Sequence, residues 1–236
     1  MAKYKRILIK ISGEALAAEK RTGYDFDFVV KVCEAVKKCA EKGVQIGIVI
    51  GGGNFWRGVK DGAGHIERVS ADSMGMLATA MNCLAVCDVF SQIGAKARVM
   101  TAVDIQGVGE RFDTKKAIEY MENGYIVLFG CGSGMPYFST DTAAALRAVE
   151  IQADALLLAK KIDGVYSADP VTHPEAYKFD EISYDEVLAR RLQVMDTTAT
   201  SLAMDNNLPI VVFALADPEN IGRVLDGERV GTTVGV

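Results

Sequence analysis

Three glycine-rich loops, each directly after a predicted buried strand, constrain the fold of this chain more than any other feature. The strands and the loops that follow them are Tyr4–Ile11 with Lys10–Glu14, Val44–Ile50 with Gly51–Arg57, and Tyr125–Phe129 with Gly130–Asp141. Glycine lets a backbone approach an anion closely, and a following helix offers free N–H groups at its positive end. In a parallel sheet such loops meet beyond the carboxyl ends of the strands. The loops therefore predict one site that handles two phosphorylated ligands.

Strand and helix patterns alternate along almost the whole sequence, as they do in α/β proteins. Beyond the three strands above, the predicted strands are Lys96–Thr101, Ala155–Ala159 and Ile210–Phe213. The predicted helices are Asp27–Lys42 with Asp27 as its N-cap, Ala71–Ile93, Thr114–Asn123, Asp141–Ile151, Tyr184–Leu188 and Thr197–Asn206. No repeat or shift in composition divides the chain. The predicted fold is one domain over residues 1–236, a three-layer α/β/α arrangement around a mainly parallel central sheet.

Charge and cysteine content exclude several classes of protein. The net charge of −5 and the isoelectric point near 5.2 argue against a nucleic-acid-binding or membrane-surface protein, which usually carries a basic face. Every apolar run is broken by charge or glycine, so we expect no membrane span. The five cysteines form no Cys-x-x-Cys pair and only two histidines accompany them. This content predicts no zinc site and a reducing, cytoplasmic environment.

Both common nucleotide-binding signatures are absent from the loops. Neither Gly-x4-Gly-Lys-Ser/Thr nor a Gly-x-Gly-x-x-Gly after the first strand occurs. Phosphoryl transfer nevertheless needs little beyond positioning and neutralised charge. Lys10, next to Ser12 and Gly13 at a strand end, is the favoured phosphate-binding lysine; the alternative is a lysine that reaches solvent. Arg57, after the glycine triplet, is either a second cation of the site or a surface arginine over the loop.

Three aspartates stand at predicted helix starts. Asp72 is either a first-turn acid favoured by the helix dipole or a ligand contact. Asp141 has the same two interpretations, and a carboxylate beside a phosphate loop can also orient Mg²⁺ or a lysine. From the sequence alone, Asp196 is interpreted as an N-cap.

The loops together resemble those of the amino acid kinase family, and within it the bacterial uridylate kinases. The resemblance runs from Lys5 to about Val234 and rests on Lys10–Leu16, Ile50–Gly58, Ala71–Thr79, Gly132–Asp141, Asp163–Pro170 and Val194–Asp196. The Gly-Gly-Gly-Asn and Met-Gly-Met-Leu-Ala-Thr elements are specific to the uridylate kinases rather than to the fold. The resemblance implies ATP-dependent phosphorylation of UMP to UDP in pyrimidine nucleotide biosynthesis, by direct in-line transfer.

The resemblance also implies a role for each matching position. The implied ATP contacts are Lys10, Ile11, Ser12, Gly13, Gly53, Arg57, Lys160, Tyr166 and Asp169. The implied UMP contacts are Gly52, Asp72 (to the ribose hydroxyls), Ser133, Gly134, Met135, Pro136, Tyr137, Phe138, Ser139 and Thr140. The implied catalytic residues are Lys10, Arg57, Asp141 and Asp196. No protein-bound metal is implied, because Mg²⁺ would arrive as Mg-ATP.

Assembly and regulation are implied by resemblance alone. The family implies a homohexamer that GTP activates and UTP inhibits. No residue of this chain is assigned to the effector site. A methionine stripe in the long predicted helix indicates either core or a subunit interface, and its members are Met74, Met76 and Met81.

The chain departs from the family pattern at three places. Met135 stands where an asparagine is usual, which removes an amide that could read the pyrimidine. Tyr137 and Ser139 replace phenylalanine and threonine, a mild change. Lys160 stands where many members have a small hydroxyl residue, and we expect its cation to offset the lost hydrogen bond near the donor nucleotide. These changes concern base selectivity and donor affinity rather than the reaction.

Three other functions share these features. The first is another kinase of the same fold, acting on a carboxylate, carbamate or isoprenoid phosphate. The second is molybdenum or tungsten oxoanion storage, which would need a cage of polar or histidine side chains. The third is a nucleotide sensor with weak catalysis. Asp72 and the Ser133–Asp141 loop favour a phosphorylated ribonucleotide as acceptor, and hence the nucleotide kinase.

Overall fold

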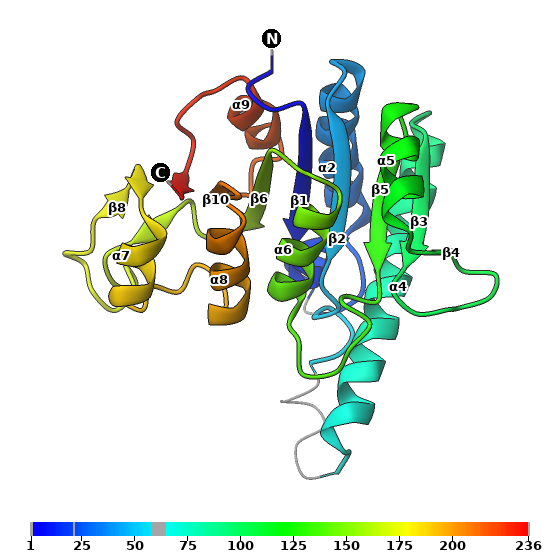
Figure 1. The fold of residues 1–236 in the computed structure, drawn as a ribbon, viewed down its shortest axis with the longest axis horizontal. Coiled ribbons are helices and arrows are strands. Elements are labelled where there is room, and N and C mark those ends of the chain that lie inside the picture. Colours follow the sequence, from blue (N-terminus) through cyan, green and yellow to red (C-terminus); the bar gives the residue numbers. More distant parts are fainter. Residues whose placement is uncertain (1, 21, 58–64, 236) are drawn as a thin grey trace.

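A mainly parallel sheet forms the centre of the computed structural model, which describes residues 2–20, 22–57 and 65–235 (Figure 1). The strands of the nine-stranded sheet are, in spatial order, β4 (Glu110–Arg111), β3 (Ala97–Thr101), β5 (Ile126–Gly130), β2 (Gln45–Ile50), β1 (Arg6–Ile11), β6 (Ala155–Lys160), β10 (Ile210–Ala214), β11 (Thr232–Val234) and β9 (Glu181–Ile182). Among the described residues of this sheet, β10–β11 is the one antiparallel pair and the other pairs are parallel. A separate antiparallel pair consists of β7 (Val165–Tyr166) and β8 (Lys178–Phe179).

Helices cover both faces of the sheet and complete the three predicted layers (Figure 1). One face packs against α2 (Phe26–Glu41), α4 (Arg68–Gln92) and α9 (Asn220–Leu225). The other face packs against α5 (Thr114–Glu122), α6 (Thr140–Glu150), α7 (Tyr184–Ala189) and α8 (Thr197–Asp205). The alternation of β1 explains why both cores form: Ile7 and Ile9 belong to the first, and Leu8 to the second.

The position of β1 at the middle of the sheet determines where the site lies. It pairs in parallel with β2 and with β6, and the register sets Lys10 opposite Val49 on one side and Leu158 on the other. Lys10 faces the same side of the sheet as Leu8, toward α6. The carboxyl ends of these strands meet the N-terminal half of α4, which extends past the sheet edge (Figure 1).

The structure corrects and extends the predicted elements. The N-cap of α2 is Asp25, whose side chain accepts a hydrogen bond from the Phe28 N–H, so the assignment of this cap to Asp27 is wrong. Asp27 lies instead in the first turn. The five-residue helix α1 (Gly13–Ala17), α9 and the short strands β4, β7, β8, β9 and β11 were not predicted. Gly58, the last residue of the second motif, lies outside the described residues.

The long helix α4 differs from the expectation that no apolar run could span a membrane. Its length and composition alone would allow it to cross a bilayer. It packs against α2, β3 and β5, as the core helices of globular proteins do. Its first turns also carry the ion pair of Arg68 and Asp72.

Candidate active site

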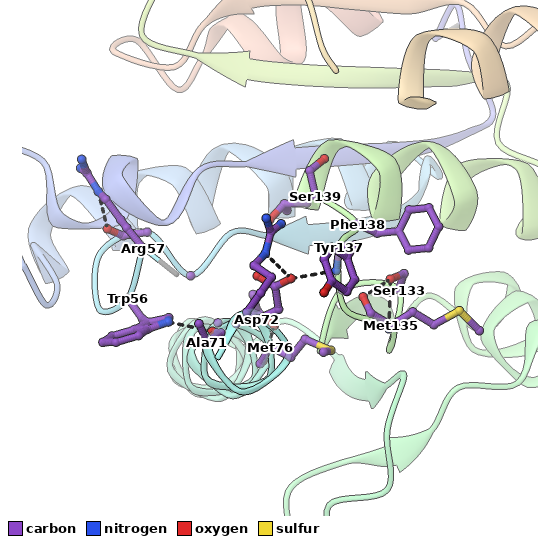
Figure 2. A pocket seen from close by; sticks show the side chains of 17 residues that line it. Trp56, Arg57, Ala71, Asp72, Met76, Ser133, Met135, Tyr137, Phe138 and Ser139 are labelled. Carbon is purple, nitrogen blue, oxygen red and sulfur yellow. Dashed lines mark hydrogen bonds and ion pairs between the residues drawn. The ribbon is translucent and has the colours of Figure 1, made fainter. Parts of the chain in front are cut away.

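A cavity of about 380 Å³ lies where the second and third glycine loops meet α4 (Figure 2). Its lining comprises Gly52, Gly53, Trp56, Arg57, Arg68, Ala71, Asp72, Gly75, Met76, Thr79, Gly132, Ser133, Met135, Tyr137, Phe138, Ser139 and Thr140. Most residues predicted to contact UMP therefore line one space, which we call the acceptor cavity.

Close packing and an amide pair hold the second glycine loop against α4. A Cβ atom on Gly52 would lie 2.9 Å from the Gly75 carbonyl oxygen, so only glycine fits without a shift. Asn54 and Asn82 exchange two side-chain hydrogen bonds of 3.0 and 2.8 Å, and the Asn82 amide also donates to the Gly51 carbonyl. These amides are buried and satisfied, which fixes the loop before any ligand arrives.

The third loop carries unusual backbone conformations for residues with side chains. Cys131 and Tyr137 have φ angles of +64° and +69°, a region that disfavours a Cβ atom. The Cys131 N–H donates to the Thr79 hydroxyl at 2.7 Å, and the Tyr137 N–H donates to Asp72 Oδ2 at 2.8 Å. Both anchors come from α4, so this helix shapes the third loop.

Met135, which the resemblance predicts to contact UMP, is exposed on the third loop. Met135 is 63% exposed, and its backbone exchanges two 3.2 Å contacts with the Ser133 hydroxyl. Figure 2 shows Met135 and Phe138 on the side of the acceptor cavity away from Trp56 and Arg57. A methionine here offers shape and polarisability rather than a hydrogen-bond pattern.

Lys10 and Asp141 form the central charged pair of the site. Lys10 Nζ lies 2.7 Å from Asp141 Oδ1, and both side chains are largely buried. Asp141 lies in the first turn of α6, whose N-cap Ser139 accepts from the Thr142 N–H. The two side chains thus place a lysine cation beside a helix N-terminus, an arrangement that favours anions.

Asp196 connects two helix N-termini. It caps α8 by accepting from the Ala199 N–H at 2.9 Å, which confirms the N-cap interpretation. The same carboxylate accepts from the Ser139 and Thr142 hydroxyls at the start of α6. Asp196 therefore fixes α6, and through it Asp141, relative to α8.

Lys160 reaches this centre from the end of β6. Its ammonium donates a hydrogen bond to the Val194 carbonyl, two residues before Asp196. Burial lowers the pKa of Lys160, repulsion from Lys10 lowers it further, and attraction by Asp141 opposes both. The charges of Lys10, Asp141 and Lys160 thus influence one another.

A second cavity, of about 270 Å³, contains the residues predicted to lie beside adenosine. Tyr166 and Asp169 line it together with Arg190, Arg191 and Gln193. The Tyr166 hydroxyl donates to Asp163 at 2.8 Å, and the Asp169 side chain accepts from the Val171 N–H at 2.9 Å. We call this space the donor cavity.

Other predicted residues occupy supporting positions. Ser12 caps α1 by accepting from the Ala15 N–H, and Gly13 begins that helix. Arg57 lines the acceptor cavity and forms a 2.8 Å ion pair with Glu14. The sequence did not predict that Trp56, Arg68 and Asn82 belong to the site. Of the three, only Arg68 has a recognisable pattern, because it precedes Asp72 by four residues, the spacing of a helical ion pair.

The five cysteine thiols are buried or half-buried. Burial raises the pKa of the Cys39 thiol to about 11, and burial also raises the pKa of Cys33, Cys83, Cys87 and Cys131. These thiols are therefore poor nucleophiles. Within the described part of the chain, no three His, Cys, Asp or Glu side chains cluster as metal ligands.

Two cavities with a buried lysine–carboxylate pair and glycine loops define a class, the phosphotransferases that bind two nucleotides. Residues 5–214 match the amino acid kinase family. The chain belongs to that family, and within it to the uridylate kinases.

Individual relatives agree along nearly the whole chain. The chain is 49% identical over 234 residues to a uridylate kinase of Porphyromonas gingivalis (strain ATCC BAA-308 / W83), covering 99% of this chain and 98% of the relative. The solved UMP kinase of Bacillus anthracis superposes with a TM-score of 0.95 at 37% identity, covering 98% of this chain and 96% of that one. The Ureaplasma parvum UMP kinase gives 0.93 at 33% identity, covering 99% and 100%.

Proposed function

We propose that the protein transfers the γ-phosphoryl group of ATP to UMP, forming ADP and UDP in pyrimidine nucleotide biosynthesis. The observation that carries the proposal is the Lys10–Asp141 pair at the end of β1, in a chain 49% identical to a uridylate kinase. All the relatives named above are uridylate or UMP kinases. They favour this reaction over oxoanion storage, nucleotide sensing and a carboxylate or isoprenoid phosphate acceptor.

The residues suit direct in-line transfer. The acceptor phosphate is ionised near neutral pH, so the reaction needs no general base. Lys10 neutralises charge on the transferred group, while Gly53, Ser12 and Gly13 offer backbone N–H groups to the donor phosphates. Asp141 holds the Lys10 ammonium in place, and Asp196 fixes the helix that carries Asp141.

Mg²⁺ fits the donor set as part of the nucleotide complex. Asp141 Oδ1 is buried and, from the described residues, receives the Lys10 ion pair but no hydrogen bond of regular geometry. Mg²⁺ is usually held by one or two carboxylates plus substrate phosphates, and Asp141 is the carboxylate that would hold it here. When bound, the ion neutralises charge on the phosphates.

The test is ADP release by the purified protein with Mg-ATP and UMP, CMP, dUMP or no acceptor. We expect UMP-dependent turnover. Comparable rates with CMP would keep the enzyme class but locate a change of base specificity in the Ser133–Thr140 loop, whereas no acceptor-dependent ADP would contradict the proposed reaction. Metal analysis of the same sample tests storage, because a storage protein would retain molybdenum or tungsten.

We expect Asp72→Asn to raise the KM for UMP about tenfold with little change for ATP, because it weakens ground-state binding of the ribose. Initial rates with each substrate varied in turn provide the measurement. Asp88→Asn, an exposed acid on the same helix, is the control and should match the unaltered protein. A change confined to the KM for ATP would reverse the assignment of Asp72.

Lys160→Thr should raise the KM for ATP about tenfold, the effect of losing one charge-assisted contact to an anion. The reason is that Lys160 is a largely buried cation whose charge interacts with Lys10 and Asp141, so its loss removes positive charge where we propose that the donor phosphates bind. The neighbouring, exposed Lys161→Thr is the control. An unchanged KM for ATP in Lys160→Thr would remove Lys160 from the donor site.

Assembly as a cytoplasmic homohexamer, with GTP and UTP as effectors, is part of the same proposal. Several large apolar side chains of α4 are exposed, which supports self-association; they are Val69, Leu77, Met81 and Leu84. Of the methionine stripe, Met74 and Met81 are exposed there and Met76 lines the acceptor cavity. Light scattering gives the oligomeric state, and rates with added GTP or UTP test regulation.

A further inference from the structure

Arg68 forms a three-membered cluster with Asp72 and Tyr137 on the wall of the acceptor cavity, where Figure 2 labels Asp72 and Tyr137. Arg68 Nε donates to Asp72 Oδ2 at 2.7 Å, and the Tyr137 N–H donates to the same oxygen at 2.8 Å. The Arg68 guanidinium carbon also lies 5.1 Å from the centre of the Tyr137 ring. Arg68 therefore contacts both the carboxylate and the loop that the carboxylate holds.

This cluster fixes the rotation of the Asp72 side chain. Two donors from different elements converge on Oδ2, one from α4 and one from the third glycine loop. A carboxylate held in this way keeps its second oxygen, Oδ1, available for another donor. A pair of neighbouring ribose hydroxyls is such a donor, and a prepositioned acceptor recognises it better than a rotating one.

The Tyr137 backbone gives a reason for the cluster beyond helix stability. Its φ of +69° is unfavourable for a residue with a Cβ atom and persists only where neighbours hold it. Asp72 supplies that restraint, and Arg68 covers the ring of the same residue. An exposed ion pair four residues apart on a helix would by itself stabilise the fold only slightly.

We infer that Arg68 is a positioning residue that orients Asp72 to accept the ribose hydroxyls, and so sets the preference for ribonucleotide over deoxyribonucleotide acceptors. The inference rests on the proposed function, because it concerns the acceptor of that reaction. Loss of Arg68 lets Asp72 rotate, and the acceptor with more hydroxyls loses more binding.

The test compares UMP with dUMP for the unaltered protein, Arg68→Gln and Arg68→Lys. We expect Arg68→Gln to raise the KM for UMP about tenfold, the effect of one lost hydrogen bond to a charged group, and the KM for dUMP much less. The KM for ATP should stay unchanged. Arg68→Lys keeps a charged donor within reach of Asp72, so its KM for UMP should lie between those of the unaltered protein and Arg68→Gln.

The control is Glu41→Gln, which removes the Lys37–Glu41 pair, also four residues apart on a helix, outside either cavity. It should leave both KM values unchanged. Equal losses for UMP and dUMP in Arg68→Gln, or no loss for either, would overturn the inference. Binding of UMP and dUMP without ATP is measured by calorimetry in parallel. A protein that fails to turn over UMP would contradict the proposed function, while the binding ratio would still decide the role of Arg68.

Discussion

Lys10→Ala should reduce kcat about a hundredfold or more, typical of removing a cation that stabilises a transition state. The structure explains the size of the effect. Lys10 Nζ is the cation 2.7 Å from Asp141, at the carboxyl end of the central strand. Without it, Asp141 is a buried carboxylate without its ion-pair partner, and the transferred group meets a negative charge where it previously met a positive one.

Steady-state rates at saturating ATP and UMP measure this effect, and thermal unfolding shows whether the fold survives. Lys10→Met keeps the aliphatic stem of the side chain and separates loss of charge from loss of packing. Lys42→Ala, which removes an exposed lysine paired with Asp226, is the matched control and should retain full activity. A nearly normal kcat in both Lys10 variants would exclude Lys10 from the transfer step.

Gly13→Ala should reduce kcat/KM for ATP at least tenfold and lower the melting temperature. A Cβ atom at this position would lie 2.3 Å from the Gly51 carbonyl oxygen and 2.8 Å from the Gly53 nitrogen. Both contacts are to backbone, so the first and second glycine loops must move apart. Overpacking of this kind typically costs about 1–3 kcal/mol of stability. The same movement displaces the N–H groups that the donor phosphates would use.

Kinetics with ATP as the varied substrate, together with a melting curve, measures both effects. Gly222→Ala is the control because its Cβ atom would meet only the Cys39 sulfur, at 3.9 Å. Gly222 lies inside α9, where alanine is the better helix former, so stability should be unchanged or higher. A Gly13→Ala protein with normal ATP kinetics would show that the two loops need not touch.

Most of the fold could be predicted because its strands are apolar runs and its helices have polar caps. Ile7, Leu8 and Ile9 are all fully buried, as a central parallel strand requires. The prediction failed where tertiary pairing decides the structure. The strand β11 is three residues long and exists because it pairs with β10 and β9. Two aspartates two residues apart could each have capped α2, and only the backbone conformation distinguishes them.

The predicted site residues come together in part because loops at the ends of parallel strands must converge. Lys10, Asp141 and Asp196 come from three distant segments and form one connected set. Residues that position other site residues have no comparable pattern in the sequence. Arg68 has the spacing of an ordinary helical ion pair, and Asn82 lies among apolar helix residues. Their roles depend on the loops that they contact, which the sequence does not place.

The central position of β1 also has a consequence for the making of the protein. This strand is synthesised before the other strands of the sheet, yet one of its two neighbours, β6, begins only at Ala155. At roughly 5–20 residues per second, synthesis of the intervening chain takes on the order of ten seconds. For that interval, one edge of β1 has no partner from its own chain. Nascent chains therefore expose an apolar strand edge to chaperones and to one another until the second half of the sheet arrives.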